Sequence, residues 1–310
     1  MTATTLPISG AGKKGPIAKG KLGRTIGYVV LYFLLIVLCL AFFFPFYSMV
    51  IGSLMPKEEL FKLYPQLWPP NGPTFNAFGI LLHLTPAAAG QQNMQNFEML
   101  RYIFNSLLMA TVTVLLQLFF NTTAGYVFAK RNFPFKTQLF GVILTTLLLP
   151  TAMNFVPFYL LMGELKWINT YLPFWIPGAA NAFGIFMMRQ FISSTIPDEL
   201  IDSARIDGAS QLGIVFRIVM PIMAGGMVVL GILSFVGSYN EFVLATLVLT
   251  RPELRTVQVA LANFRGSMIR APQYDLMFAG SVMATLPLLV IFFIFQRRII
   301  EGVMSGAIKG

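Results

Sequence analysis

The stretch DELIDSARIDGASQLGIVFRIVMP, which runs from Asp198 to Pro221, interrupts a chain that is otherwise poor in charge. It places four acidic residues within ten positions, namely Asp198, Glu199, Asp202 and Asp207. Long uncharged runs precede and follow it. This pattern indicates a polar segment set between two parts of the chain that are suited to lipid.

Local chemistry predicts two short helices within this stretch. Pro197 suits the first turn of a helix, and the acidic side chains of Asp198 and Glu199 favour its positive N-terminus. Gly208 ends this helix, because glycine costs about 1 kcal/mol in a helix interior and readily terminates one. A second helix is expected to begin at Ala209. We expect the two helices to lie on the membrane surface, joined by a bend.

The composition places the chain among membrane proteins. Of its 310 residues, 56% are hydrophobic and 11% are charged, whereas a soluble domain carries about 25% charged residues. Long uncharged runs without alternation indicate helices, and about 20 apolar residues cross the hydrocarbon core. The sequence therefore predicts an all-α membrane protein with six transmembrane helices, at Thr25–Pro56, Tyr102–Ala129, Thr137–Gly163, Trp167–Met188, Ile218–Asn240 and Leu276–Gln296.

The distribution of basic residues predicts the topology and argues against nucleic acid as a partner of this chain, whose net charge is +10. With six spans, most of the 22 Lys and Arg residues fall on one side, and the positive-inside rule makes that side cytoplasmic. They are Lys13, Lys14, Lys19, Lys21, Arg24, Lys130, Arg131, Lys136, Arg189, Arg205, Arg217, Arg297, Arg298 and Lys309. Both termini are therefore expected in the cytoplasm.

The spans divide the chain into regions. Residues 1–24 are rich in Gly and Lys and are predicted to form a disordered cytoplasmic tail. Residues 25–297 form the six-helix transmembrane domain, and residues 298–310 form a cytoplasmic C-terminal tail. The domain is expected to include an outer segment at 52–100, a cytoplasmic loop at 189–217 and an outer loop at 250–275.

The acidic loop favours protein docking over simple contact with lipid. Amphipathic helices that lie on a membrane usually carry Lys and Arg on their polar face. An acidic start is repelled by an anionic cytoplasmic leaflet and suits a basic protein surface. A surface connector without a partner remains the alternative.

No enzyme site is expected in this chain. The sequence holds one Cys and one His, which excludes a Cys or His metal cluster. No phosphate-binding loop of the G-x-x-x-x-G-K-[ST] type occurs, and no nucleophile, base and orienting group are found together. We therefore expect no catalytic residue, no metal site and no cofactor in this chain.

The acidic loop resembles the EAA loop of permease subunits in ATP-binding-cassette (ABC) importers. The family pattern is Glu-Ala-Ala, three residues, Gly, nine residues and then Ile-x-Leu-Pro. Here Asp202-Ser203-Ala204 stands for the first element, Gly208 for the glycine and Ile218-Val219-Met220-Pro221 for the last. The departures are Asp for Glu, Ser for Ala and Met for Leu.

The resemblance extends over nearly the whole chain. The segments FNSLLMA at Phe104–Ala110, YNEFVLATLVL at Tyr239–Leu249 and LRTVQVAL at Leu254–Leu261 look like elements of carbohydrate-uptake permeases. The ending FQRRIIEGVMSGAIKG at Phe295–Gly310 is similar to the tail of the second permease subunit of maltose-type importers.

The resemblance implies a type I ABC importer permease fold in a bacterial or archaeal cell (inner) membrane, crossed several times. It also implies the partners, which are a second permease subunit, an ATPase homodimer or heterodimer that binds Mg-ATP, an extracytoplasmic solute-binding protein, a sugar substrate and membrane lipid. Asp202 is expected to pair with a basic residue of the ATPase, and Gly208 is expected to permit the bend.

The resemblance further implies two sets of ATPase contacts. The coupling set is Asp198, Glu199, Asp202, Ser203, Ala204, Arg205, Asp207 and Gly208. The tail set is Gly306, Ala307, Lys309 and Gly310.

Polar residues inside the spans are candidates for the translocation path, because they are costly in lipid. The candidates for a path or gate are Asn105, Asn154, Tyr239, Asn240 and Glu241, while Gln117, Asn121 and Asn181 are further polar residues within the spans. Hydrogen bonding between neighbouring helices is the alternative role for the amides. In the outer loop, Arg255 and Arg265 are expected to contact the solute-binding protein.

Other functions stay open at this point. The same importer class for glycerol phosphate or an acidic oligosaccharide is one alternative, which the arginines of the outer loop permit. An ion-coupled secondary transporter is less favoured, since such proteins use intramembrane acids or histidines and internal repeats.

Overall fold

The computed structural model describes residues 19–60, 67–86, 97–266 and 272–307, with side chains described from residue 24 to residue 297. Every regular element in these ranges is a helix, which confirms the all-α prediction. Contacts divide the chain into residues 1–50 and residues 51–310, and each unit is described by itself below.

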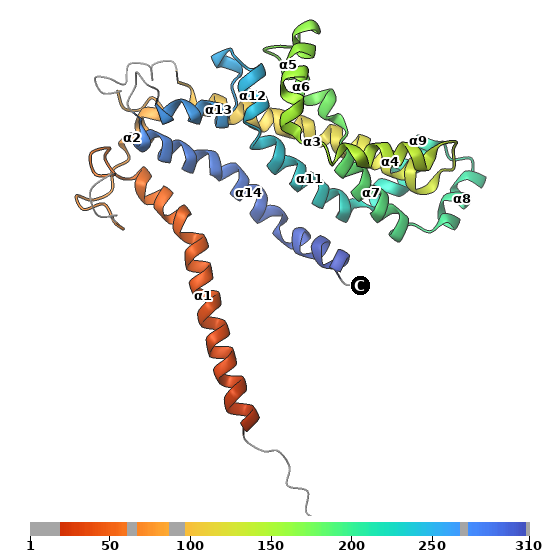
Figure 1. Ribbon diagram of the computed structural model, residues 1–310, viewed down its shortest axis with the longest axis horizontal. Helices are drawn as coiled ribbons and strands as arrows, with labels where there is room; N and C mark the ends of the chain where they lie inside the picture. Colours follow the sequence, from red (N-terminus) through yellow and green to blue (C-terminus); the bar gives the residue numbers. More distant parts are fainter. Residues whose placement is uncertain (1–18, 61–66, 87–96, 267–271, 308–310) are drawn as a thin grey trace, which may run out of the picture. The chain divides into compact units, whose positions relative to one another are not determined.

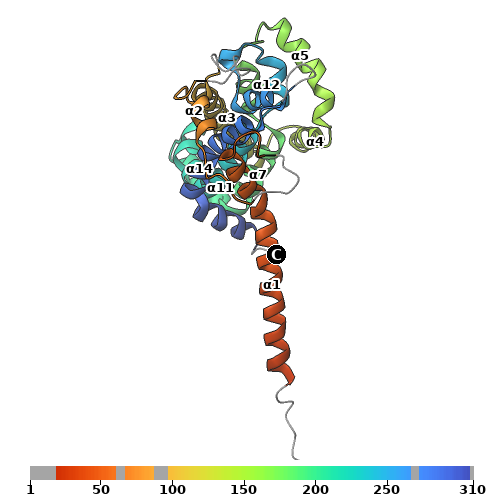
Figure 2. The same ribbon diagram turned by 90° about the vertical axis from the view of Figure 1, so that its left-hand side faces the viewer.

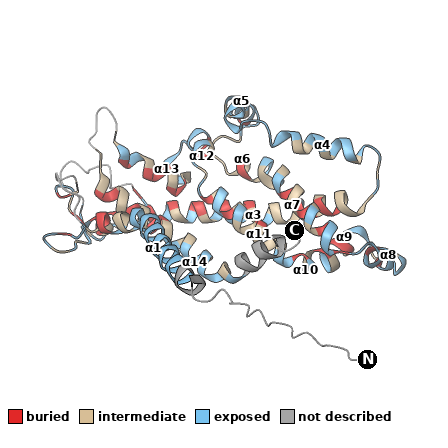
Figure 3. Ribbon diagram, turned by 60° about the horizontal axis from the view of Figure 1, so that its bottom comes forward, coloured by how far each residue is buried: buried red, intermediate tan, exposed pale blue. Residues whose placement is uncertain are grey.

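The first unit consists of most of α1, Lys19–Ser53. Its apolar side chains from Ile26 to Phe46 are exposed, as the pale blue colouring of this helix in Figure 3 shows. A helix that is apolar on all sides suits contact with lipid or with other membrane helices. The helix begins at Lys19, whereas the sequence predicts a tail that continues to residue 24.

The second unit contains two long helices, α3 and α14, and several shorter helices, of which α7 and α11 pack along α3 (Figure 1). The elements of this unit are α2 Asn76–Leu81, α3 Met99–Lys130, α4 Lys136–Thr146, η2 Thr151–Asn154, α5 Phe155–Glu164, α6 Leu172–Trp175, η3 Pro177–Ala179, α7 Ala182–Thr195, α8 Asp198–Ile206, α9 Gln211–Ile214, η4 Val215–Val219, α10 Met220–Ile222, α11 Ala224–Tyr239, α12 Val243–Val248, η5 Pro252–Leu254, α13 Val257–Ala262, η6 Asn263–Arg265 and α14 Tyr274–Ala307.

Helix α3 packs against α7 and α11, and α11 in turn packs against α14. Gly125 allows the close approach of α3 to α7, because a Cβ atom added there would lie 2.8 Å from the Cβ atom of Met188. Small residues permit such approaches between membrane helices, whose association depends on close packing. By contrast, α4 and α5 lie at the edge of the unit (Figure 2), and their side chains are mostly exposed.

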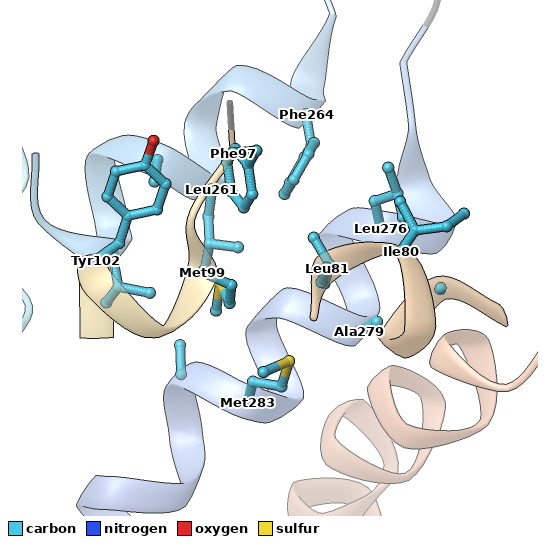
Figure 4. Packing of buried hydrophobic residues seen from close by; sticks show 14 of the residues in the cluster. Ile80, Leu81, Phe97, Met99, Tyr102, Leu261, Phe264, Leu276, Ala279 and Met283 are labelled. Carbon is cyan, nitrogen blue, oxygen red and sulfur yellow. The ribbon is translucent and has the colours of Figure 1, made fainter. Parts of the chain in front are cut away.

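A hydrophobic cluster closes one end of the unit, where α2, α3, α13 and α14 meet (Figure 4). The ring centroid of Phe97 lies 5.0 Å from that of Tyr102 and 4.8 Å from that of Phe264. Leu81 and Leu276 are also buried in this cluster. The cluster therefore joins the start of α3 to the segment that precedes α14.

Three helices of the described chain are long and apolar enough to cross a membrane, at Arg24–Ser53, Met99–Lys130 and Tyr274–Arg297. Two further spans result if each of two bent pairs counts as one, with bends of 93° between α4 and η2–α5 and of 84° between α10 and α11. The remaining predicted span, Trp167–Met188, is divided among α6, η3 and α7. Prolines lie at several of these breaks, with Pro150 directly before η2, Pro177 at the start of η3 and Pro221 in α10. The span prediction rests on the absence of charge and therefore treats each run as continuous.

Candidate coupling surface and translocation path

Helix α8 has the boundaries that its sequence favours. Its first turn carries Asp198 and Glu199, and its end is closed by backbone hydrogen bonds from Gly208 to Arg205 and from Ala209 to Ala204, each 3.0 Å long. These two bonds form a Schellman motif, which requires a left-handed residue after the helix. Gly208 supplies it with a φ of 78°.

The second helix of the loop begins later than the sequence suggests. Helix α9 starts at Gln211 rather than at Ala209, because the hydroxyl of Ser210 accepts a hydrogen bond from the Gly213 amide at 3.1 Å and caps the helix. A π-helical turn follows at Val215–Val219. The loop therefore contains two short helices joined by a bend, as predicted.

One face of the loop is packed and the other is exposed. Ile201 and Ala204 are buried in a cluster with Tyr126 of α3 and Met188 of α7. Ile206, in contrast, is 87% exposed at the end of α8. Leu212 of α9 and Leu200 of α8 are exposed as well. The exposed face thus presents apolar side chains beside its acidic ones, a composition suited to burial against a protein.

Two of the acidic side chains form ion pairs within the chain. Oδ1 of Asp198 lies 2.7 Å from Nζ of Lys130, and Oδ1 of Asp202 lies 2.7 Å from a guanidinium nitrogen of Arg205. The hydrogen bond donated by Lys130, together with its charge, lowers the pKa of Asp198. Glu199 forms no ion pair with any described residue.

The remaining residues of the coupling and tail sets have the following places. Ser203 and Asp207 are exposed, and the Ser203 hydroxyl donates to the carbonyl of Leu200 at 3.0 Å. The backbone of α14 includes Gly306 and Ala307. Lys309 and Gly310 lie outside the described residues.

The end of α3 at Lys130 contacts several parts of the loop. The Tyr126 hydroxyl donates to Oε1 of Gln211 at 3.3 Å, and the Arg205 guanidinium reaches the carbonyl of Lys130 at 3.5 Å. The opposite end of α3 holds the outer loop, where the Asn105 amide donates to the carbonyls of Glu253 and Arg255 at 2.9 and 3.0 Å. Helix α3 therefore connects the two loops directly.

The five candidates for the translocation path lie in different places. Asn105 is buried against the outer loop, as described, and Asn154 is exposed in η2. Tyr239 is fully buried and donates its hydroxyl to the carbonyl of Ala284 at 2.9 Å. Asn240 accepts from Gln258 at 2.9 Å. These four residues contact other elements or solvent, and none of them lines the pocket that contains Glu241.

That pocket has a volume of about 470 Å³ and lies among α3, α5, the segment from α6 to α7, and α11. Glu241 is half-buried, and its Oε1 atom accepts a hydrogen bond from the Leu244 amide at 3.0 Å. Gln117 of α3 is a second polar residue of the wall. Ser234 and Ser238 also line it, although a serine in an apolar run is a weak sequence signal.

The two arginines of the outer loop differ in their surroundings. Arg255 is half-buried and donates to the carbonyl of Thr250 at 3.1 Å. Arg265 is exposed in η6. Both belong to the segment that is held by Asn105 and by the hydroxyl of Ser106, which accepts from the Val257 amide at 2.8 Å.

Comparison with known proteins identifies related chains. Residues 121–304 match the family described as "Binding-protein-dependent transport system inner membrane component". The chain is 29% identical over 290 residues to the arabinooligosaccharides transport system permease protein of Bacillus subtilis (strain 168), with 91% of this chain and 95% of the relative covered. It is 30% identical over 289 residues to the melibiose/raffinose/stachyose import permease protein of the same organism, with 93% and 99% covered.

A solved structure has a similar fold. A chain from the crystal structure of a bacterial ABC transporter involved in the import of the acidic polysaccharide alginate aligns with a TM-score of 0.75 and 20% sequence identity. The alignment covers 91% of this chain and 99% of that chain. At this identity the similarity concerns the fold alone.

Proposed function

Because this chain belongs to the family of binding-protein-dependent transport system inner membrane components, we propose that it is a permease subunit of an ABC importer that takes up a sugar or an oligosaccharide. The relatives named above are permeases for oligosaccharide uptake. ATP is hydrolysed on separate subunits in this proposal, and this chain contributes the membrane path.

The observation that carries the proposal is the exposed loop α8–α9 at the end of α3. The family match includes this loop, and Ile206 with the acidic side chains around it forms a surface that fits a separate protein. In the proposed complex, one ATPase of a pair receives α8, and a second permease completes the path. The same proposal includes a location in the cell membrane with six membrane spans and cytoplasmic termini. It also includes a solute-binding protein outside the membrane.

Movement of the ATPase would reach the path through α3. The loop is tied to α3 by Lys130 and Tyr126, and α3 carries Gln117 in the wall of the pocket. A displacement of α8 is therefore expected to shift α3 as a unit, since packed helices move as rigid elements rather than deforming continuously.

Native mass spectrometry of the tagged chain, purified from its own host in mild detergent, tests the proposal. We expect a complex with one second permease and two ATPase copies. Recovery of the chain alone or as a homodimer, under several gentle conditions, would contradict it and would favour a secondary transporter. The variant Asp202→Lys distinguishes two roles of the loop. If the loop serves assembly alone, the complex of this variant should lose the ATPase altogether.

A further inference from the structure

The pocket that contains Glu241 has the dimensions and walls of a small-molecule site. Its volume of about 470 Å³ lies within the range of about 300–1,000 Å³ that is usual for such sites. Phe158, Phe174 and Phe183 contribute aromatic side chains to its walls. Aromatic faces with a few polar groups are a suitable surface for a sugar ring, which has apolar C–H faces and hydroxyl edges.

Gln117 presents an unused acceptor at this wall. Its Nε2 atom donates to the carbonyl of Gly178 at 2.9 Å, which fixes the orientation of the amide. Its Oε1 atom is buried and has no hydrogen-bond partner within the described residues. Buried polar atoms are paired in the great majority of cases, so an acceptor held in this way is suited to a hydroxyl donor from a ligand.

Helix α11 contributes a polar stripe to the same pocket. Ser234 and Ser238 are four residues apart and lie on one face of α11, and Glu241 follows two residues after the helix ends at Tyr239. Neither serine hydroxyl makes a hydrogen bond to any residue that the structure describes. Ser281 of α14, by comparison, donates to the carbonyl of Met277 at 2.7 Å. The two serines therefore keep donors and acceptors for a ligand.

The charge of the pocket selects against anions. Glu241 is the one ionisable side chain among its lining residues, which include no Lys, Arg or His. A carboxylate or phosphate would approach an acidic group without a cation to compensate it. The N-terminus of α7 also reaches the pocket, but Oδ1 of Asn181 already accepts from the Gly184 amide at 2.7 Å. One of the free amides at that helix end is thus already paired within the chain, which weakens the attraction of the helix end for an anion.

We propose that this pocket is a carbohydrate subsite that takes the hydroxyls of a neutral sugar, with Gln117, Ser234, Ser238 and Glu241 as its polar contacts. This chain then contacts the substrate itself rather than leaving that task to the second permease. The substrate class is a neutral oligosaccharide and not a sugar acid or a sugar phosphate. The inference rests on the proposed function and narrows it.

The test uses the complete complex in proteoliposomes together with its solute-binding protein. Raffinose, maltotriose and arabinotriose serve as neutral probes, and glycerol 3-phosphate and an alginate trisaccharide serve as anionic probes. We expect a neutral probe to give the largest stimulation of ATP hydrolysis and to be transported. Stimulation and transport by an anionic probe alone would overturn the assignment of substrate class.

Substitutions in the wall test the subsite. Gln117→Leu and Ser238→Ala are each expected to reduce transport of the neutral probe at least fivefold, whereas Ser238→Thr, which keeps the hydroxyl, should restore most of it. Matched controls are Gln296→Leu and Ser281→Ala, whose polar groups bond to carbonyls of α14 and whose transport should be unchanged. If Gln117→Leu prevents assembly of the complex, the smaller change Ser238→Ala still tests the subsite.

The outcomes are distinguishable from failure of the proposed function. Normal transport by Gln117→Leu and Ser238→Ala, in a complex that contains the ATPase, would reject the subsite and leave the importer function intact. A chain that never associates with an ATPase would instead reject the proposed function, together with the inference that rests on it.

Discussion

The ammonium group of Lys130 lies 2.7 Å from Oδ1 of Asp198, and this ion pair joins the last residue of α3 to the first residue of α8. The Lys130 side chain is 7% exposed and that of Asp198 is 77% exposed. The lysine is therefore held by the fold, and the acid at the start of the candidate coupling loop is fixed to it. Asp198 orients α8 in this arrangement, which leaves Ile206 and the remaining acids to meet a partner.

Reversal of this ion pair should uncouple the loop from α3. Lys130→Glu places two acids in contact, one of them largely buried, and like charges in such a position are unfavourable. We expect stimulation of ATP hydrolysis by the solute-binding protein to fall at least fivefold. The double variant Lys130→Glu/Asp198→Lys should recover at least half of the stimulation. Both are measured on the purified complex.

The matched control for this pair is Arg101→Glu at the opposite end of the same helix. Arg101 forms an exposed ion pair with Glu98 at 3.0 Å, and exposed pairs contribute about 0–1 kcal/mol. This variant should retain stimulation within about twofold. Equal losses in Lys130→Glu and Arg101→Glu, or no recovery in the double variant, would count against a specific link between Lys130 and Asp198.

The effect of pH on this ion pair has a defined sign. The pKa of Asp198 is lowered, first by the hydrogen bond from Lys130, so its contribution is present above the ordinary carboxyl pKa of about 3.9 and is lost as the pH falls through the lowered value. The ratio of stimulated hydrolysis between the wild type and Asp198→Asn should therefore be constant from pH 8 to about pH 5. A change in this ratio centred between pH 6 and 7 would contradict the ionised pair.

Gly208 should resist replacement for reasons of backbone geometry alone. Its φ of 78° is unfavourable for residues with a Cβ atom, yet no atom lies within 4 Å of a Cβ atom added there. We expect the rate of coupled ATP hydrolysis to fall from the wild type to Gly208→Asn, then to Gly208→Ala and then to Gly208→Val. Asn comes first among the variants because it tolerates left-handed φ best among the other residues. Gly208→Val should insert into the membrane normally but fail to couple.

The control for this series is Gly27→Ala in α1, where an added Cβ atom also meets open space but φ is not positive. This variant should couple normally. Normal stimulated hydrolysis in Gly208→Val would show that the bend does not depend on the glycine.

Ile206 should contribute apolar area to the proposed ATPase contact. It is 87% exposed, and burial of an exposed isoleucine side chain typically contributes about 1.5–3 kcal/mol. Ile206→Asp should therefore reduce the amount of ATPase retained during purification at least tenfold, as measured by quantitative gel densitometry. Ile206→Val should retain it, and equal retention in all three proteins would exclude Ile206 from the contact.

Arg255 and Arg265 should affect the response to the solute-binding protein and not assembly. Arg265 is exposed, and Arg255 is fixed by its bond to Thr250. Arg255→Glu/Arg265→Glu should raise the concentration of binding protein needed for half-maximal stimulation severalfold, more strongly at low salt because exposed charges are screened. Lys166→Glu, a charge reversal in a different turn between helices, serves as the control. An unchanged half-maximal concentration would remove both arginines from the contact.

The sequence by itself determined the features that depend on local chemistry. Uncharged runs predicted an all-α membrane chain, and the acidic stretch with Gly208 predicted two short helices and a bend, because helix ends and left-handed residues are set by neighbours within a few positions. The spacing from Asp202 to Pro221 was enough to suggest the family. Uncharged runs did not predict the breaks within the spans, although Pro150 and Pro177 lie at two of them. A proline alone does not identify a break, because Pro45 lies inside α1 and Pro287 inside α14.

Tertiary structure alone decided which distant residues meet. Asp198 pairs with Lys130, 68 positions away, and Tyr239 donates to the carbonyl of Ala284, 45 positions away. The expected coupling residue Asp198 is therefore held by α3, and the path candidate Tyr239 is buried. Gln117 and Glu241 share a pocket only because α3 packs beside α11. Which helices pack together depends on how the shapes of their apolar surfaces fit, and the apolar runs of this chain look alike in sequence. The packing of the helices then decides which polar groups meet.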